Sequence, residues 1–275
     1  MKILIRGAGD LASGIACRLY RCGFQIVMTE IGVPTTVRRT VAFSPAIYLG
    51  EMMVEDIQAV RCDSMEEIEA AVEQEKIAVV QDPQCHMVFQ WKPDVVVDAI
   101  LAKTNLGTTM KDAETVIGVG PGFTAGVDCH CVVETKRGHD LGRCIWEGSA
   151  IPNTGVPGMI GGYAKERLIK ASADGIFKGM CKIGDLVEKD QVIGVVVKAS
   201  GEEVPVKTQL SGVIRGLLQD GVPVTEGLKS GDVDPRNVVG SCYTVSDKAT
   251  AIGGGVLEAI MKHQRMLGRR VRFEA

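Results

Sequence analysis

The residues best suited to chemistry lie in a glycine-rich stretch that runs from residue 117 to residue 163. Glycine lets a backbone adopt positive φ or approach another group closely, and binding residues are often carried on such loops. We therefore expect this stretch to line a site; the alternative is a set of tight turns between short strands. The polar and ionisable residues between its glycines are Asp128, His130, Glu134, Arg137, His139, Asp140, Arg143 and Asn153.

Asp128 and His130 fall on one face of a segment whose residues alternate between two faces. A carboxylate beside an imidazole gives a group that titrates near neutral pH. Arg137 and His139 follow where this segment turns, and we expect all four residues to converge with Asp98, which lies near the end of a buried strand. In the alternative, Arg137 and His139 are exposed turn residues. The candidate catalytic residues are thus Asp98, Asp128, His130 and His139, with Arg137 as a contact for a bound anion.

Cys129 and Cys131 flank His130, but their spacing is not that of a zinc knuckle, and no second close pair of cysteines follows. We expect no metal site here and interpret the two thiols as small buried apolar groups. The chain has 9 cysteines. An odd number of cysteines, with no secretory pattern at the start of the sequence, favours free thiols and a reducing, cytoplasmic location.

A second group of candidate residues stands at the start of the chain, where Gly7 and Gly9 begin the pattern G-x-G-x-x-A between a strand and a helix. Glu30 follows the next strand at the spacing expected of an acid that binds a ribose. Backbone amides at the start of such a helix can hold an anion. Asp10 either contacts the ligand or caps the helix, and its negative charge does not favour a pyrophosphate there.

These elements predict an α/β protein with a Rossmann-like, mostly parallel sheet. Ligands of open α/β sheets bind beyond the carboxyl ends of the strands. The strand before Gly120 and Gly122 delivers the chain to that edge. We therefore add both glycines to the predicted cofactor-binding residues, which are Gly7, Gly9, Asp10, Glu30, Gly120, Gly122 and Arg137.

The pattern changes after residue 170, where short apolar runs alternate with turns. We predict a Rossmann-like domain over 1–170, a small all-β module over 171–240, and a strand and helix over 241–275 that pack back on the first domain. The module resembles the biotinyl/lipoyl-type barrel-sandwich fold. Gly201 stands at the position where carrier domains of this type present their modified lysine, so the module is not expected to carry a prosthetic group.

Composition excludes two classes of partner. A net charge of −3 and an aromatic content of 4% argue against nucleic acid binding. No apolar run approaches the roughly 18 residues needed to span a membrane.

Motifs along nearly the whole chain resemble the YqeB family, which accompanies selenium-dependent molybdenum hydroxylases. They include IRGAGDLASGIA, VVVDAILAK, GVGPGFTAGVD, ETKRGHDLGR and IGGGVLEAI. The N-terminal part is also similar to the Rossmann-like domain of XdhC-type proteins.

The resemblance implies an accessory protein that matures such a hydroxylase and binds an anionic cofactor, a molybdenum cofactor precursor (a pterin) or a nucleotide. Its expected partners are a molybdenum hydroxylase client, an anionic small molecule and a second copy of itself. The alternative is an NAD(P)-dependent oxidoreductase that uses Gly7, Gly9 and Glu30 for the cofactor and His130 or His139 as acid or base. No Tyr-x-x-x-Lys pair supports hydride transfer, and whether the protein is an enzyme is left open.

Overall fold

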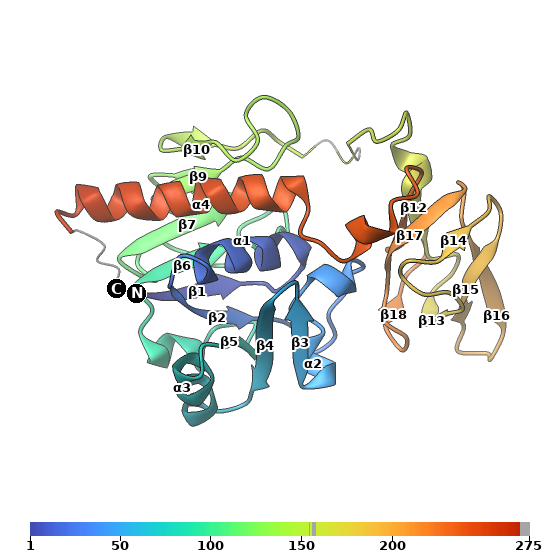
Figure 1. Cartoon of the computed structure of the whole chain (residues 1–275), viewed down its shortest axis with the longest axis horizontal. Coiled ribbons are helices and arrows are strands. Elements are labelled where there is room, and N and C mark those ends of the chain that lie inside the picture. The colour runs from blue at the N-terminus through green and yellow to red at the C-terminus, as the bar shows by residue number, and fades with distance from the viewer. Residues whose placement is uncertain (154, 156–157, 270–275) are drawn as a thin grey trace. The chain divides into compact units, whose positions relative to one another are not determined.

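The computed structural model describes residues 1–153, 155 and 158–269, which divide into two compact units (Figure 1). Unit 1 comprises the described parts of residues 1–32, 42–154 and 245–275. Unit 2 comprises the described parts of residues 33–41 and 155–244. The chain therefore leaves unit 1 for unit 2 twice and returns twice.

Unit 1 is built on a nine-stranded sheet. Its inner strands are parallel, whereas the strand at each edge is antiparallel to its neighbour. The central strands are short runs of Ile, Leu and Val, as expected where both faces of a sheet are covered. The strand order is β10 (Cys144–Ile145), β9 (Cys131–Val133), β7 (Thr115–Val119), β6 (Val95–Asp98), β1 (Lys2–Arg6), β2 (Gln25–Thr29), β5 (Ile77–Val80), β4 (Ile57–Cys62) and β3 (Glu51–Val54).

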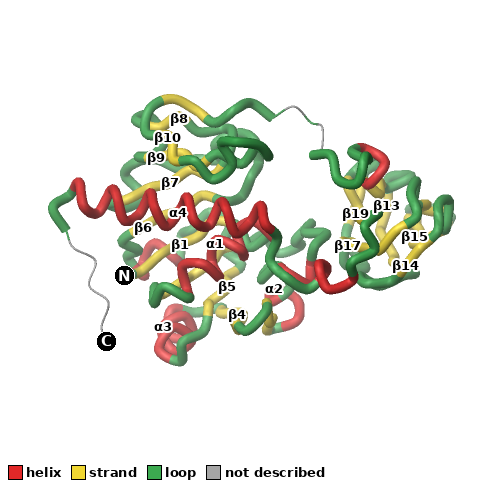
Figure 2. The backbone as a smooth tube through the Cα atoms, turned by 45° about the horizontal axis from the view of Figure 1, so that its top comes forward, coloured by secondary structure: helices red, strands yellow, loops and turns green. Residues whose placement is uncertain are grey.

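Two helices of unit 1 lie side by side, α1 (Asp10–Tyr20) and α4 (Asp247–Met266) (Figure 2). Glycines allow their close contact: a Cβ on Gly253 would lie 3.2 Å from the carbonyl oxygen of Gly14 in α1. Interior glycines weaken a helix by roughly 1 kcal/mol each, and at Gly253 this cost is explained by the close packing against α1. The other helices of unit 1 are α2 (Ala46–Leu49), α3 (Met65–Glu73) and the 3₁₀ helix η2 (Val88–Trp91).

The predicted fold class is wrong. In place of a mostly parallel Rossmann-like sheet with one inserted barrel-sandwich module, the described residues form a large mixed sheet and three further antiparallel sheets. The smallest of these pairs β8 (Thr124–Ala125) with β11 (Gly148–Ser149).

The connections between strands explain the difference. A doubly wound fold needs a crossover helix between successive parallel strands. Residues 99–114, all of them described, join β6 to β7 without a helix, and only η2 lies between β5 and β6. At the edges, β3 pairs with β4 and β10 with β9 as antiparallel strands. Apolar periodicity locates strands, but it does not specify the neighbour or the direction of an edge strand.

Unit 2 holds two four-stranded antiparallel sheets. One has the order β12 (Leu168–Lys170), β19 (Lys229–Asp234), β17 (Gly212–Leu217), β14 (Leu186–Val187); the other has the order β16 (Glu203–Lys207), β15 (Val192–Val197), β13 (Gly175–Gly179), β18 (Pro223–Val224).

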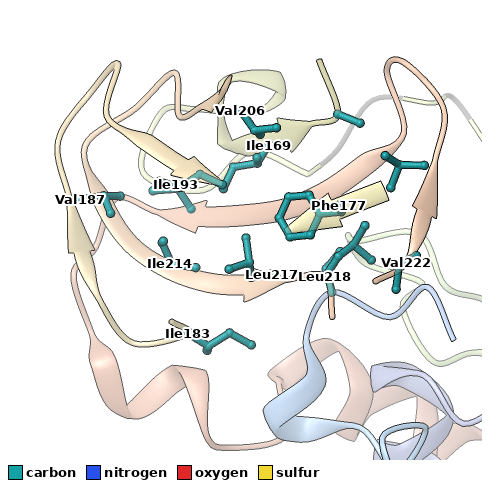
Figure 3. Packing of buried hydrophobic residues seen from close by; sticks show 14 of the residues in the cluster. Ile169, Phe177, Ile183, Val187, Ile193, Val206, Ile214, Leu217, Leu218 and Val222 are labelled. Carbon is teal, nitrogen blue, oxygen red and sulfur yellow. The ribbon is translucent and has the colours of Figure 1, made fainter. Parts of the chain in front are cut away.

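The core of unit 2 is aliphatic around a single fully buried ring, that of Phe177 (Figure 3). Ile193, Val206, Ile214 and Leu217 belong to the same cluster. The 33–41 segment belongs to this unit, because the amide of Leu217 donates to the carbonyl of Val37 at 2.8 Å.

The short helices of unit 2 are η1 (Arg39–Val41), η3 (Lys165–Arg167) and η4 (Val239–Cys242). The strand predicted at the start of the 241–275 segment is absent from its described part: the chain forms η4 and then enters α4, which Ser246 caps by accepting from the amide of Ala249 at 3.2 Å. Residues 270–275, the end of that predicted segment, lie outside the described residues. Over the described ranges, no helix is long and apolar enough to cross a membrane.

Candidate functional site

The best candidate site lies in unit 1, where β1, β2, β6 and β7 end. We define the strand-end site as the glycine turn 7–9, Glu30, the loop 99–104 and the glycine turn 120–122. The two turns pack against the loop. Gly7 has φ +93°, and a Cβ there would lie 3.0 Å from the carbonyl oxygen of Ala99. Gly122 has φ +113°, and a Cβ there would lie 2.8 Å from the amide nitrogen of Thr104.

The 99–104 loop is itself conformationally strained. Leu101 has φ 62° and Lys103 has φ 68°, both in the left-handed region. Such a conformation costs a non-glycine residue on the order of 1–3 kcal/mol, and it persists only where the surroundings hold it. Strained residues of this kind concentrate at binding and catalytic sites. Lys103 is also exposed, which leaves a cationic side chain on this loop.

A buried ion pair fixes the beginning of this loop. Asp98 is 1% exposed, and its carboxylate accepts from Arg6 at 3.2 Å and from the hydroxyl of Thr108 at 2.6 Å. Its other oxygen accepts from the amide of Ile100 at 3.2 Å. The Arg6 guanidinium also donates to the hydroxyl of Thr108 and to the carbonyl of Leu106 at 3.4 Å. Asp98 therefore holds the loop in place, and both of its oxygens are occupied.

Glu30 closes the first glycine turn from the side of β2. One of its oxygens accepts from the amide of Ala8 at 3.0 Å, and the other accepts from the amide of Ile31 at 2.9 Å. Burial raises the pKa of the Glu30 carboxyl, while these two amide bonds act in the opposite direction. The Glu30 carboxylate thus accepts from the Ala8 amide, which a phosphate at this turn would otherwise use. Asp10 in the first turn of α1 adds a second negative charge there.

Asp128 and His130 each accept a hydrogen bond from a backbone amide of unit 1. The carboxylate of Asp128 accepts from the amide of Thr124 at 2.8 Å, which is a local turn contact. Nδ1 of His130 accepts from the amide of Val116 at 3.0 Å, and its ring lies 4.3 Å from the ring of His263 in α4. Burial lowers the pKa of both histidines, and for His263 the neighbouring His130 lowers it further.

Arg137 and His139 occupy an exposed turn. Arg137 donates to both carboxylate oxygens of Asp247, at 2.6 and 2.8 Å, at the beginning of α4. The predicted convergence of these residues with Asp98 stays a prediction. Asp98 is paired with Arg6, and Arg137 with Asp247. The catalytic roles assigned to the four candidates stay predictions.

Sequence reasoning assigned no role to two charged residues that have structural roles. Glu134 is 2% exposed, and its carboxylate accepts from the amides of Thr135 and Lys136, both at 2.7 Å, and of Ile151 at 2.8 Å. Arg6, at the end of β1, is 6% exposed. An acid after Val132-Val133 and a base inside an apolar strand are the signals that could have identified them. Within the described part of the chain, no cluster of three or more His, Cys, Asp or Glu residues could hold a metal ion.

The comparisons with known proteins give one strong relative. No model of a protein family matches the chain. It is 51% identical over 259 residues to a protein of Escherichia coli strain K12 described as "Uncharacterized protein YqeB", and the match covers 94% of this chain and 47% of that protein. The chain thus spans about half the length of the curated relative it matches.

Three similar solved structures are an aspartoacylase family protein from Mesorhizobium loti, the apo ectoine utilization protein EutE from Ruegeria pomeroyi and a succinylglutamate desuccinylase from a Silicibacter species. Their sequence identities are 11%, 10% and 12%, and their TM-scores are 0.25, 0.27 and 0.26. The matches cover 78%, 84% and 84% of this chain, and 58%, 85% and 84% of those chains. At these scores no activity is carried over from them.

The matched structures are described as desuccinylase, aspartoacylase and ectoine utilization proteins. The predicted function is wrong on this finding: neither an accessory protein for a selenium-dependent molybdenum hydroxylase nor the alternative NAD(P)-dependent oxidoreductase is carried forward, and the likeness to XdhC-type domains falls with them. The predicted partners stay predictions, and of these the anionic small molecule is taken further.

Proposed function

We propose that this chain, which belongs to the YqeB family, binds a small molecule at the strand-end site. This molecule carries both an anionic group and hydroxyl groups. The observation that carries the proposal is the strained loop 99–104. Two of its non-glycine residues have positive φ, and it is packed between the backbones of two glycine turns. A loop held in this way presents its backbone in one conformation, so a ligand does not have to order the backbone on binding.

Glu30 and Lys103 supply complementary contacts for such a ligand. An ionised carboxylate has about four acceptor positions. The two amides that bond Glu30 leave some of these positions available to ligand hydroxyls. Lys103 offers three ammonium donors to an anionic group. Since Asp10 and Glu30 place negative charge at the start of α1, we assign the anionic group to the side of Lys103 rather than to the helix N-terminus.

The test is thermal unfolding with a panel of hydroxylated phosphates and carboxylates, followed by calorimetric titration of any compound that stabilises the protein. A ligand at one hundred times its Kd stabilises by about 2.7 kcal/mol. We expect Lys103→Gln to weaken the binding of compounds that carry the anionic group. We expect Glu30→Gln to weaken the binding of compounds that carry the hydroxyl groups. Lys111→Gln, an exposed lysine of the same unit, is the matched control.

Equal affinity for charged and uncharged analogues, or equal affinity of Lys103→Gln and Lys111→Gln, would remove the anionic contact from the proposal. If none of the panel stabilises the protein, the strand-end site is not a small-molecule site of this class.

A further inference from the structure

Two cysteines from neighbouring strands lie together beneath α4. In the antiparallel pair of β9 and β10, Cys144 is opposite Val133, so Cys131 is its diagonal neighbour on the same face. This face is turned toward α4, because a Cβ on Gly255 would lie 2.9 Å from a methyl carbon of Val133. The thiol of Cys131 donates to the carbonyl of Val132 at 3.6 Å, and each of the two thiols shifts the pKa of the other.

The two thiols differ in their access to solvent. Cys131 is 1% exposed, whereas Cys144 is only half-buried. The thiol of Cys144 also donates to the carbonyl of Gly255 in α4 at 3.1 Å. A reagent in solution can therefore reach Cys144 before it reaches Cys131.

The charge environment also separates the two thiols. The neighbouring thiol of Cys131 lowers the pKa of Cys144, while burial acts in the opposite direction. On α4, Glu258 raises the pKa of Cys144 and Lys262 lowers it, and ionisation also costs the bond to Gly255. For Cys131, the neighbouring Cys144 and burial both raise the pKa. Cys144 is therefore the thiol that ionises first, and the thiolate is the reactive form.

We propose that Cys144 and Cys131 form a redox-active dithiol that reduces low-molecular-weight disulfides. This inference does not depend on the strand-end site. Cys129 does not share the role: its side chain belongs to the apolar cluster on the other face of the sheet, and burial raises its pKa to about 11.

The reaction balances as two exchanges. The Cys144 thiolate attacks one sulfur of the substrate disulfide, a protein–substrate disulfide forms, and the other half leaves as a thiolate that takes up a proton. Cys131 then loses its proton and attacks the Cys144 sulfur, which forms the Cys131–Cys144 bond and releases the second half as a thiol. The protein is oxidised by two electrons and the substrate disulfide is reduced to two thiols.

The strand that carries Cys144 can accommodate the new bond. Diagonal neighbours in an antiparallel pair lie about 7–8 Å apart, beyond the Cα separation of about 4.4–6.8 Å that is usual in disulfides, so the new bond requires backbone movement. β10 is two residues long and stands at the edge of the nine-stranded sheet. A small shift of this short edge strand closes the distance without disturbing the inner strands.

The experiment uses the full chain, reduced and then mixed with glutathione disulfide as the probe. The reaction is stopped with acid, remaining thiols are alkylated, and unreduced peptides are mapped by mass spectrometry. We expect a Cys131–Cys144 disulfide in the wild type. In Cys131→Ser we expect glutathione to remain bound to Cys144, and in Cys144→Ser we expect neither product.

Cys181→Ser is the matched control, because Cys181 is a half-buried cysteine of unit 2, away from this pair in the chain. It should react like the wild type. Glutathione spread evenly over Cys181 and Cys144 without a Cys131–Cys144 linkage would overturn the proposal, as would a folded Cys131→Ser protein that gains no glutathione at Cys144. If circular dichroism shows that Cys131→Ser is unfolded, the wild-type peptide map decides.

Discussion

At the scale of single residues, two Arg–Asp ion pairs of unit 1 differ in burial and therefore in their contribution to stability. Arg6 and Asp98 are buried and share Thr108 as a partner, whereas Arg137 and Asp247 meet on the surface. Removing one member of a buried pair leaves an uncompensated charge and costs about 3–5 kcal/mol, while an exposed pair contributes about 0.2–1 kcal/mol. Burial, not the pairing itself, decides how much each pair matters to stability.

We therefore predict that Asp98→Asn lowers the free energy of unfolding by about 3–5 kcal/mol, because Arg6 stays buried without its counterion. Urea unfolding followed by circular dichroism measures this loss. Arg137→Gln is the control and should change stability by less than about 1 kcal/mol. Similar losses in the two variants would show that Asp98 does not hold the 99–104 loop through its charge.

The sequence identified Asp98 and Arg137 as important residues but not their partners. Both are polar residues at the ends of apolar segments, which a single chain reveals. Their partners, Arg6 and Asp247, are 92 and 110 residues away along the chain. Local patterns carry no information about such contacts, and this is why these two pairs could not be predicted from the sequence.

At the scale of elements, the sequence indicated where helices begin and where the chain turns better than it indicated which strands pair. Ser64 caps α3 by accepting from the amide of Glu67 at 3.2 Å, as the spacing of a capping residue predicts. The glycine turn between β1 and α1 is also where the sequence places it. The edge strands β3 and β10 were not predictable as antiparallel, because composition does not specify the direction of an edge strand.

The glycines of α4 allow a matched test of element packing. A Cβ on Gly255 would overlap the carbonyl oxygen of Gly142, whereas a Cβ on Gly254 would meet nothing within 4 Å. We predict that Gly254→Ala stabilises the protein by about 1 kcal/mol through helix propensity. Gly255→Ala gains the same propensity but should be destabilising, since the carbonyl of Gly142 has to move. Chemical denaturation compares the two, and a stabilising Gly255→Ala would show that α4 does not need this close approach.

At the scale of the whole molecule, the chain divides its apolar residues between separate cores. Phe177 belongs to the cluster of unit 2, whereas Val96 and Trp91 belong to a cluster of unit 1. Both tryptophans of the chain, Trp91 and Trp146, lie in unit 1. Tryptophan fluorescence therefore reports the unfolding of unit 1, while far-ultraviolet circular dichroism reports both units.

We predict that Phe177→Ala separates these two signals. Replacing a buried phenylalanine by alanine costs about 3–5 kcal/mol, because the cavity is filled only in part. Since Phe177 is fully buried in the core of unit 2, we expect an earlier transition by circular dichroism and an unchanged transition by tryptophan fluorescence. Val96→Ala, a fully buried position of unit 1, should instead move the fluorescence transition. If Phe177→Ala shifts both signals by the same amount, the two units unfold as one cooperative structure, and the four passages of the chain between them couple their stabilities.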